Sequence, residues 1–242
     1  MIVHLVEYTG RHADEPARAA AELLVTTKAT RLTINESFEK VNAMDGEELY
    51  EELQYMASTI PSSWEFLDVT FLVEGVSRAC AQQITRTRTG SYAMQSQRVT
   101  DASQMDVINP YSEDDPLFNY FNDSVECAQD SYRTLITSGA TAQDARGLLP
   151  MNTSCNIWCK YNFRSFVDLV KARSSHRTQD EYYNIVMEMK KRVIAVWPFA
   201  ALFFTSSNDK ALALLDEIIK DAGLDTGKGT GWKAAKVQDL LR

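Results

Sequence analysis

Apolar residues recur along this chain in two spacings, every second position or every third and fourth, and the two spacings alternate. Ile2 to Tyr8 alternates and is rich in Val, Ile and Leu, which predicts a strand. Asp14 followed by Pro16 is typical of the start of a helix. Further strands are predicted at 66–74, ended by Gly75, and at 154–161, and helices at 17–24, 35–55 with a break near 44–46, from 77 or 78 up to Arg86, 117–135, 141–149, 163–172 and 179–204 with a kink at Pro198.

Strands and helices follow one another without a regular repeat. The predicted class is therefore α+β, a mixed β-sheet flanked by helices, and not a parallel α/β repeat. The 242 residues suffice for one large domain with a sizeable core. With 45% hydrophobic and 24% charged residues, the composition is that of an ordinary soluble globular protein.

The charge balance narrows the classes of partner. A net charge of −8 argues against general binding to nucleic acid or to an anionic membrane. No apolar stretch approaches the roughly 20 residues needed to span a bilayer, and residues 1–8 lack the features of a secretory signal. We therefore expect a cytoplasmic protein with no nucleic-acid or membrane partner, and a small polyanion as the ligand of any basic site.

Cysteine and histidine usage indicates a reducing compartment and no metal. Cys155 and Cys159 lack the CxxC spacing of redox and zinc sites, and all the cysteines lie in segments that look buried. We expect reduced core thiols. The three histidines form no cluster with the cysteines, so no metal site is predicted. The cysteines are Cys80, Cys127, Cys155 and Cys159.

Residues 86–98, here named the arginine loop, combine Arg86, Arg88 and Arg98 with serines, glutamines and one glycine. Arginine binds phosphate oxygens through two parallel hydrogen bonds, and serine and glutamine add neutral partners that can reorient. On an acidic chain, such a loop predicts a site for a small anion. The alternative is a solvated loop whose arginines pair with the acidic surplus elsewhere, and composition alone leaves both open.

A second polar group lies in the C-terminal half. Arg164 and Asp168 are four residues apart and therefore share one face of the helix predicted there. The alternatives are surface ion pairs, each worth about 0.3–0.5 kcal/mol, and a second part of the anion site. The group consists of Arg146, Asn162, Arg164, Asp168, Arg173, Arg177, Gln179 and Glu181.

Together the two groups resemble the flavin-dependent thymidylate synthases. The arginine loop is similar to the signature of that family, with the matching positions at Arg86, Arg88, Ser91, Ser96 and Arg98. The segments 74–83, 145–150, 162–164 and 173–181 resemble the family as well. The resemblance covers roughly residues 1–205 and implies a domain of the thymidylate synthase-complementing protein-like fold over 1–205, followed by a helical C-terminal extension over 206–242.

The chain departs from the family pattern at positions that bear on chemistry. Thr87 stands where the signature has His, and Asp168 where the family usually has Asn. The segment 61–68 lacks the histidines that are usual there. Because the arginines suited to phosphate remain, these departures concern the reaction more than the scaffold. The other replaced signature positions are Ala93, Met94 and Val99.

The resemblance implies a reaction in which a one-carbon unit passes from methylenetetrahydrofolate to C5 of a deoxypyrimidine monophosphate, dUMP becoming dTMP. It implies FAD as the cofactor, reduced by NADPH, and a homotetramer whose sites draw residues from several chains. None of the cysteines stands beside basic groups that would activate a nucleophilic thiolate. That absence is consistent with a flavin route that uses no protein nucleophile.

The same resemblance assigns roles by position. Arg173 and Ser96 are expected to be catalytic, and Arg173 is expected to face the carbonyl edge of the pyrimidine and stabilise negative charge there. The expected substrate-binding residues are Gln83, Arg86, Gln95, Ser96, Arg98, Arg146 and Arg173. The expected cofactor-binding residues are Ser63, Arg86, Arg88, Asn162, Arg164, Asp168 and Arg177.

Two alternative functions stay open. Asp168 favours a variant that acts on dCMP, by 5-methylation or hydroxymethylation, because a carboxylate accepts a hydrogen bond from an exocyclic amino group. Thr87 favours an inactive homologue that binds nucleotide or flavin without turnover, because the usual His is lost. The sequence leaves the choice of pyrimidine open.

Overall fold

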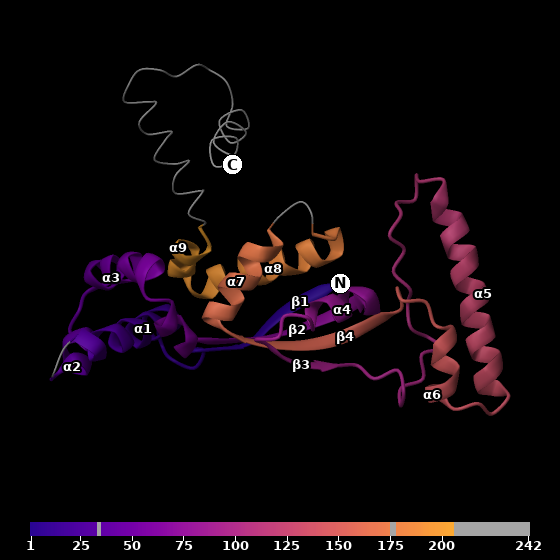
Figure 1. Ribbon diagram of the computed structural model, residues 1–242, viewed down its shortest axis with the longest axis horizontal. Coiled ribbons are helices and arrows are strands. Elements are labelled where there is room, and N and C mark those ends of the chain that lie inside the picture. The colour runs from indigo at the N-terminus through magenta and orange to yellow at the C-terminus, as the bar shows by residue number, and fades with distance from the viewer. Residues whose placement is uncertain (33–34, 175–177, 206–242) are drawn as a thin grey trace, which may run out of the picture.

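The computed structural model describes residues 1–32, 35–174 and 178–205. Within them the chain forms one sheet, a layer of helices on one of its faces, and helical extensions at its two ends (Figure 1). The predicted extension at 206–242 lies outside the described residues. No described helix is long and apolar enough to cross a membrane, and the same residues hold no group of His, Cys, Asp and Glu side chains suited to a metal ion.

The sheet has four strands in the order β1-β2-β4-β3. The predicted α+β class is confirmed, whereas the sheet, predicted to be mixed, pairs only antiparallel strands in the described residues. The first strand has the bounds that its alternating pattern predicts. The strands are β1 (Ile2–Tyr8), β2 (Asp68–Ser77), β3 (Ser91–Met94) and β4 (Ser154–Asn162).

Helices α4, α7 and α8 cover one face of the sheet, α1 to α3 lie at one end of the molecule, and α5 and α6 project at the other end (Figure 1). No described helix covers the opposite face, so Trp158 of β4 is 42% exposed. The helices are α1 (Pro16–Leu32), α2 (Ser37–Asn42), α3 (Gly46–Thr59), α4 (Arg78–Ile84), α5 (Leu117–Thr137), α6 (Ala142–Ala145), α7 (Phe163–Arg173), α8 (Asp180–Val196) and α9 (Ala201–Phe204), with 3₁₀ turns η1 (Pro61–Phe66), η2 (Arg146–Leu148) and η3 (Pro198–Ala200).

Strand β2 continues past Gly75, where the sequence predicts its end. The register of β2 against β4 shifts between Val73 and Val76, which marks a bulge. Gly75 has a φ of 67°, a left-handed conformation that other residues adopt at a cost. The glycine therefore bends the strand and does not end it. Ser77 then caps α4, its hydroxyl accepting a hydrogen bond from the Cys80 N–H at 3.0 Å.

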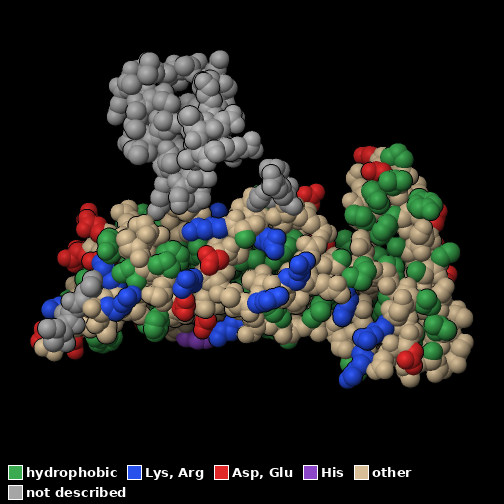
Figure 2. Space-filling view, viewed as in Figure 1, with side chains coloured by type: hydrophobic (Ala, Val, Ile, Leu, Met, Phe, Trp, Pro, Cys, Tyr) green, Lys and Arg blue, Asp and Glu red, His purple; other side chains and the backbone are tan. Residues whose placement is uncertain are grey.

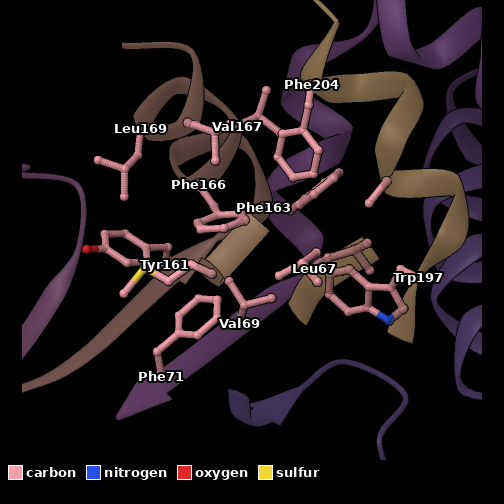
Figure 3. Close-up of a cluster of buried hydrophobic side chains, with 14 of the residues drawn as sticks. Leu67, Val69, Phe71, Tyr161, Phe163, Phe166, Val167, Leu169, Trp197 and Phe204 are labelled. Carbon is pink, nitrogen blue, oxygen red and sulfur yellow. The ribbon is translucent and has the colours of Figure 1, made fainter. Parts of the chain in front are cut away.

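The core lies between the sheet and helices α7 and α8 and is rich in aromatic rings (Figure 3). Phe163, the first residue of α7, meets the rings of Trp197, Phe203 and Phe204 edge-on at centroid distances of 5.8, 5.2 and 5.9 Å. Edge-to-face contacts of this kind add to the free energy that burial alone supplies. The cluster fixes α7 on the sheet, and α7 carries several of the predicted site residues.

Residues 101–149, here named the arm, contain α5 and α6 and have a small core of their own. Tyr132 is the one fully buried residue of α5, and its hydroxyl accepts a hydrogen bond from the Ala102 N–H at 3.1 Å. Ala145 completes this small cluster. Cys127 is exposed on α5, so the prediction of buried thiols is wrong for Cys127, whereas the other three free cysteines are buried.

Candidate functional site

The arginine loop contains a strand that the sequence did not predict. Ser91–Met94 form β3 and pair with β4. A pattern of four residues is too short to predict this long-range pairing. A Cβ atom on Gly90 would lie 2.6 Å from Cε1 of Tyr161 and 2.7 Å from Cζ of Tyr92. Glycine is therefore needed where these two rings pack against the loop. The Tyr92 hydroxyl also donates to the Thr87 carbonyl oxygen at 2.6 Å, which closes the loop on itself.

The three arginines of the loop are exposed to solvent. Arg86, Arg88 and Arg98 are exposed and form no ion pair with another described residue. The alternative that they pair with the acidic surplus is therefore not observed in this part of the chain. Lys and Arg side chains gather across the middle of the face shown in Figure 2 and toward the arm. Such a surface can accept an anion without first breaking ion pairs.

The end of the arginine loop is held by β4. The Gln95 N–H donates to the Asn156 carbonyl at 2.9 Å, and Oε1 of Gln95 accepts from the Asn156 N–H at 3.1 Å. The amide nitrogen of Gln95 is what remains for a ligand. Oγ of Ser96 accepts from the Arg98 N–H at 3.2 Å in a turn that leaves both side chains exposed. Arg146 begins η2 in the arm and is exposed as well.

Two polar contacts tie the start of α8 to α4. Glu181 accepts hydrogen bonds from the Ser77 N–H at 2.7 Å and from the Ser77 hydroxyl at 2.6 Å. The Gln83 amide donates to Oε1 of Gln179. The sequence marked Glu181 as part of a motif without assigning it a role. The structure shows that it holds the start of the helix that leads into the arginine loop.

Arg173, in the last turn of α7, lies against a buried tyrosine. Its guanidinium carbon is 5.1 Å from the ring centroid of Tyr182. Its Nε is buried and has no hydrogen-bond partner among the described residues. Tyr182 is 1% exposed, and burial raises its pKa above the ordinary value, an effect that Thr87 and Arg173 partly offset. A buried donor without a partner is open to a ligand acceptor.

A further group of predicted residues lies at the carboxyl end of β4. Asn162 caps α7 by accepting from the Ser165 N–H at 2.9 Å. Arg164 pairs with Glu65 of η1 at 2.7 Å. The ion pair that the spacing of Arg164 and Asp168 allows does not form. Asp168 is exposed and has no ion pair with a described residue.

A pocket of about 430 Å³ lies beside this group, between α1 and η1. Ser63, predicted as a cofactor residue, lines it and is 3% exposed. Nη1 of Arg31 is 3.2 Å from Oγ of Ser62 on the same wall. The sequence analysis missed Arg31 and the hydroxyls of α1, whose signal was a helix with several threonines on neighbouring turns. The remaining lining residues are Thr26, Thr27, Thr30 and Phe66.

One chain does not bring all the predicted residues together. Asn162 and Arg164 lie at one end of β4, whereas Gln95 pairs with Asn156 near its other end. The nine residues of β4 span about 30 Å. Arg173 lies against Tyr182 of α8, the helix that also neighbours α4. Arg177 lies outside the described residues.

Comparison with known proteins identifies the family of this chain. A flavin-dependent thymidylate synthase from Geobacter sulfurreducens is 28% identical over 236 residues, which is 96% of each chain. One from Haloarcula marismortui is 29% identical over 223 residues, covering 78% of this chain and 89% of the relative. The crystal structure of the UMP/dUMP methylase PolB from Streptomyces cacaoi, bound with 5-Br dUMP, has a TM-score of 0.64 at 20% identity and covers 84% of this chain and 94% of that one.

The likeness to the methylase concerns the fold, since so low an identity carries no more. The sequence model of the thymidylate synthase complementing proteins matches residues 4–199, well over half of the chain. This match confirms the family that the arginine loop predicts. The chain therefore belongs to the thymidylate synthase complementing protein family and is a divergent, methyltransferase-type enzyme among the flavin-dependent thymidylate synthases.

Proposed function

We propose that this chain transfers a one-carbon unit from methylenetetrahydrofolate to C5 of a deoxypyrimidine monophosphate and reduces it, converting dUMP to dTMP. The curated relatives are flavin-dependent thymidylate synthases, which supports the proposal. FAD, when bound, supplies the hydride that turns the methylene group into methyl, and NADPH is the proposed source of the two electrons. The residues of this chain bind, orient and polarise the reactants.

The observation that carries the proposal is the set of unpaired arginines at motif positions. Arg86, Arg88 and Arg98 form no ion pair with a described residue although the chain has a net charge of −8. A solvated loop on an acidic body would be expected to use that surplus. Free guanidinium groups beside neutral hydroxyl and amide donors suit the phosphate of a nucleotide.

We assign the nucleotide phosphate and sugar to the end of the arginine loop and to the arm. Ser96 and Arg98 share a tight turn that presents both side chains to solvent. Arg146 adds a second exposed guanidinium from η2. Gln83, Arg86 and Gln95 complete the substrate set by motif position. Charge-assisted contacts of this kind each contribute about 1.5–3 kcal/mol.

We assign Arg173 to the pyrimidine. Its side chain is half-buried and its Nε has no partner among the described residues, so the exposed part of the guanidinium would face a carbonyl oxygen of the base. Negative charge develops on the ring when hydride reaches the one-carbon unit, and a fixed guanidinium stabilises that charge. Ser96 takes its catalytic role from its position in the family motif, where its exposed hydroxyl would orient the substrate.

The donor set at the carboxyl end of β4 suits a dinucleotide flavin. The pocket lined by Ser63 offers several hydroxyls and the cation of Arg31, which match a pyrophosphate group. Arg164 is already held in place by Glu65. Asn162 uses its oxygen to cap α7 and keeps its amide hydrogens for a ligand. The proposed flavin-binding residues are Ser63, Arg86, Arg88, Asn162, Arg164, Asp168 and Arg177.

We also propose a cytoplasmic homotetramer with sites shared between chains. Asn162 and Arg164 of the proposed flavin set lie at the carboxyl end of β4, whereas Gln95 of the proposed nucleotide set pairs with Asn156 near the other end. A neighbouring chain would bring residues of the two sets together. The helix-free face of the sheet, with Trp158 at 42% exposure, is available for such a contact. Residues 1–205 would form the catalytic unit, and 206–242 an extension of it.

A second candidate function is action on dCMP. Asp168 is exposed and free of ion pairs with described residues, because Arg164 pairs with Glu65 instead. A free carboxylate accepts a hydrogen bond from the amino group that distinguishes cytosine from uracil. Either 5-methylation or hydroxymethylation of dCMP would fit this contact. The experiment below separates the two substrates.

The test uses the purified full chain. Its visible spectrum reports bound flavin, and mass spectrometry reports nucleotide products formed with methylenetetrahydrofolate, NADPH and either dUMP or dCMP. Formation of dTMP supports the main proposal. A methylated or hydroxymethylated dCMP replaces it with the second candidate. Retained flavin absorbance without NADPH oxidation or product overturns both and identifies an inactive binding homologue.

A pair of arginine variants tests the assigned site. R98A is expected to raise the KM for the nucleotide about tenfold to a hundredfold, since it removes a charge-assisted contact. R192A is the matched control, because Arg192 lies on α8, pairs with Glu188 at 2.8 Å and belongs to no predicted site. Equal KM values for the two variants would remove Arg98 from the phosphate site.

A further inference from the structure

Three separate elements meet at the side chain of Tyr182. Thr87 lies in the turn after α4, Arg173 in the last turn of α7, and Tyr182 in the first turn of α8. The phenol ring contacts the guanidinium, and the hydroxyl lies 3.4 Å from Oγ1 of Thr87. One buried side chain therefore touches both the arginine loop and the arginine assigned to the pyrimidine.

The ring face of Tyr182 contacts the Arg173 guanidinium. The guanidinium carbon lies 5.1 Å from the ring centroid, within the distance of about 6 Å at which a ring face attracts a cation. The Nε atom has no hydrogen-bond partner in the described part of the chain. Without the ring, the Arg173 side chain would be freer to change rotamer. Binding of the ligand would then have to order this side chain, and the entropy lost in doing so would raise the barrier of the reaction.

The hydroxyl of Tyr182 holds the turn that carries Arg86 and Arg88. Thr87 is anchored on its other side, because its carbonyl oxygen accepts from the Tyr92 hydroxyl at 2.6 Å and from the Gly90 N–H at 3.2 Å. Burial raises the pKa of Tyr182, so the phenol stays neutral and keeps its proton at physiological pH. A neutral hydroxyl can serve Thr87 as donor or acceptor.

We propose that Tyr182 is a positioning residue that sets Arg173 and the arginine loop relative to one another through its ring face and its hydroxyl. The inference rests on the proposed function, since it concerns the same site. It also gives Thr87 a role at the position where the family signature has His. The threonine keeps a hydroxyl that reaches α8, so the loop stays anchored without an imidazole.

A purely structural role is the competing explanation, because a tyrosine that is 1% exposed also fills the core. The two explanations differ for Tyr182→Phe, which keeps the packing and the ring but removes the hydroxyl. A core role predicts unchanged kinetics for this variant. A positioning role predicts slower turnover at unchanged stability.

A double-mutant cycle measures the hydroxyl contact. Y182F and T87V are each expected to lower kcat for the nucleotide about threefold to tenfold, as for one lost hydrogen bond. The double variant is expected to be no slower than Y182F alone, because Y182F already removes the contact that T87V removes. T87S keeps a hydroxyl and is expected to have a kcat close to that of the wild-type protein. Y183F is the matched control, since Tyr183 is its neighbour on α8 and 36% exposed.

Additive losses in the double variant, or wild-type kcat in Y182F, would overturn the hydroxyl part of the proposal. Thermal unfolding of all variants is measured in parallel. Equal melting temperatures with altered kcat exclude a core effect.

The ring contact is tested without turnover. In the wild-type protein labelled with ¹⁵N-arginine, the Arg173 Nε–H signal, assigned by its loss in R173K, is expected to show a nuclear Overhauser effect to the Tyr182 ring and an upfield ring-current shift. Y182F is expected to keep that shift. An Nε–H signal at the position of a solvated arginine would overturn the inference. If the signal is shifted as expected while no nucleotide is bound or converted, the proposed function fails and the positioning geometry stands.

Discussion

Helices α7 and α5 are both amphipathic but differ in how many of their residues are buried. Helix α7 has 11 residues and buries six of them against the sheet and the aromatic cluster. Helix α5 has 21 residues and fully buries one. Both carry a clear apolar face, so the difference lies in what each helix meets in the fold.

This contrast indicates that α7 is a rigid part of the molecule and that the arm offers a surface for recognition. Helix α7 is fixed by core packing and holds Arg164 and Arg173 in defined positions. The arm depends on a small cluster around Tyr132, and it exposes Leu117 and Tyr120 at 49% and 73%. Exposed apolar side chains on a projecting helix are typical of a surface that meets another protein. The arm therefore presents an exposed apolar surface, at which the proposed contact with a second copy of the chain can be tested.

The largest expected effect concerns the body. Phe163→Ala removes a ring that meets three other rings, and the cavity left behind should lower the free energy of unfolding by about 3–5 kcal/mol. Urea unfolding followed by far-UV circular dichroism measures the loss. A loss below about 1 kcal/mol, within the range of surface changes, would show that α7 does not depend on this cluster.

Alkaline pH should reveal the burial of a thiol in the body. Burial raises the pKa of Cys159 from 9.0 to about 12. Because the unfolded thiol ionises first, the stability that Cys159 contributes is complete below about pH 9 and is lost as the pH rises toward 12, by at most about 1.4 kcal/mol per pH unit. Cys159→Ala should flatten the decline of unfolding free energy over this range.

Cys127 on the exposed face of α5 provides a control for thiol burial. Cys127 should react with iodoacetamide in the native protein, while the buried thiols react only on unfolding. Equal reactivity of buried and exposed thiols in the native protein would contradict the assignment to burial.

A smaller effect is expected inside the arm. Tyr132→Phe removes the hydroxyl that accepts from the Ala102 N–H at 3.1 Å and should cost about 0.5–1.5 kcal/mol. The loss should appear in hydrogen exchange of the α5 amides, with exchange in α7 unchanged, because the two helices belong to separate clusters. Faster exchange in both helices would mean that arm and body unfold together.

The smallest effect is expected at the outer face of the arm. Tyr120→Ser should change the free energy of unfolding of a monomer by no more than about 0.5 kcal/mol, since the side chain is 73% exposed. Light scattering after size-exclusion chromatography measures its effect on assembly. A wild-type tetramer that Tyr120→Ser dissociates would assign this face to the subunit contact. An unchanged tetramer would mean that the subunits meet through other surfaces, such as the open face of the sheet.

Much of the local structure was predictable because it depends on local chemistry. The alternation over Ile2–Tyr8 leads to β1 with its predicted bounds, and the Asp14 and Pro16 signal leads to the predicted start of α1. Helix α1 continues to Leu32, beyond its predicted end at residue 24. Asp45 caps α3 through both members of a capping box, which explains the predicted break near residues 44–46. The same holds for the family motif, because its residues and spacing are local features of the chain.

The sequence by itself therefore determined the α+β class, the family and the candidate arginines. Tertiary structure decided what depends on distant partners. Strand β3 forms because it pairs with β4. Gly75 bends β2 without ending it, because the strand pairs with β4 on both sides of the bulge. Arg164 forms an ion pair with Glu65 and not with Asp168. Tyr182 contacts both Thr87 and Arg173. Pattern and propensity act over a few residues, whereas these contacts join segments that only the folded chain brings together.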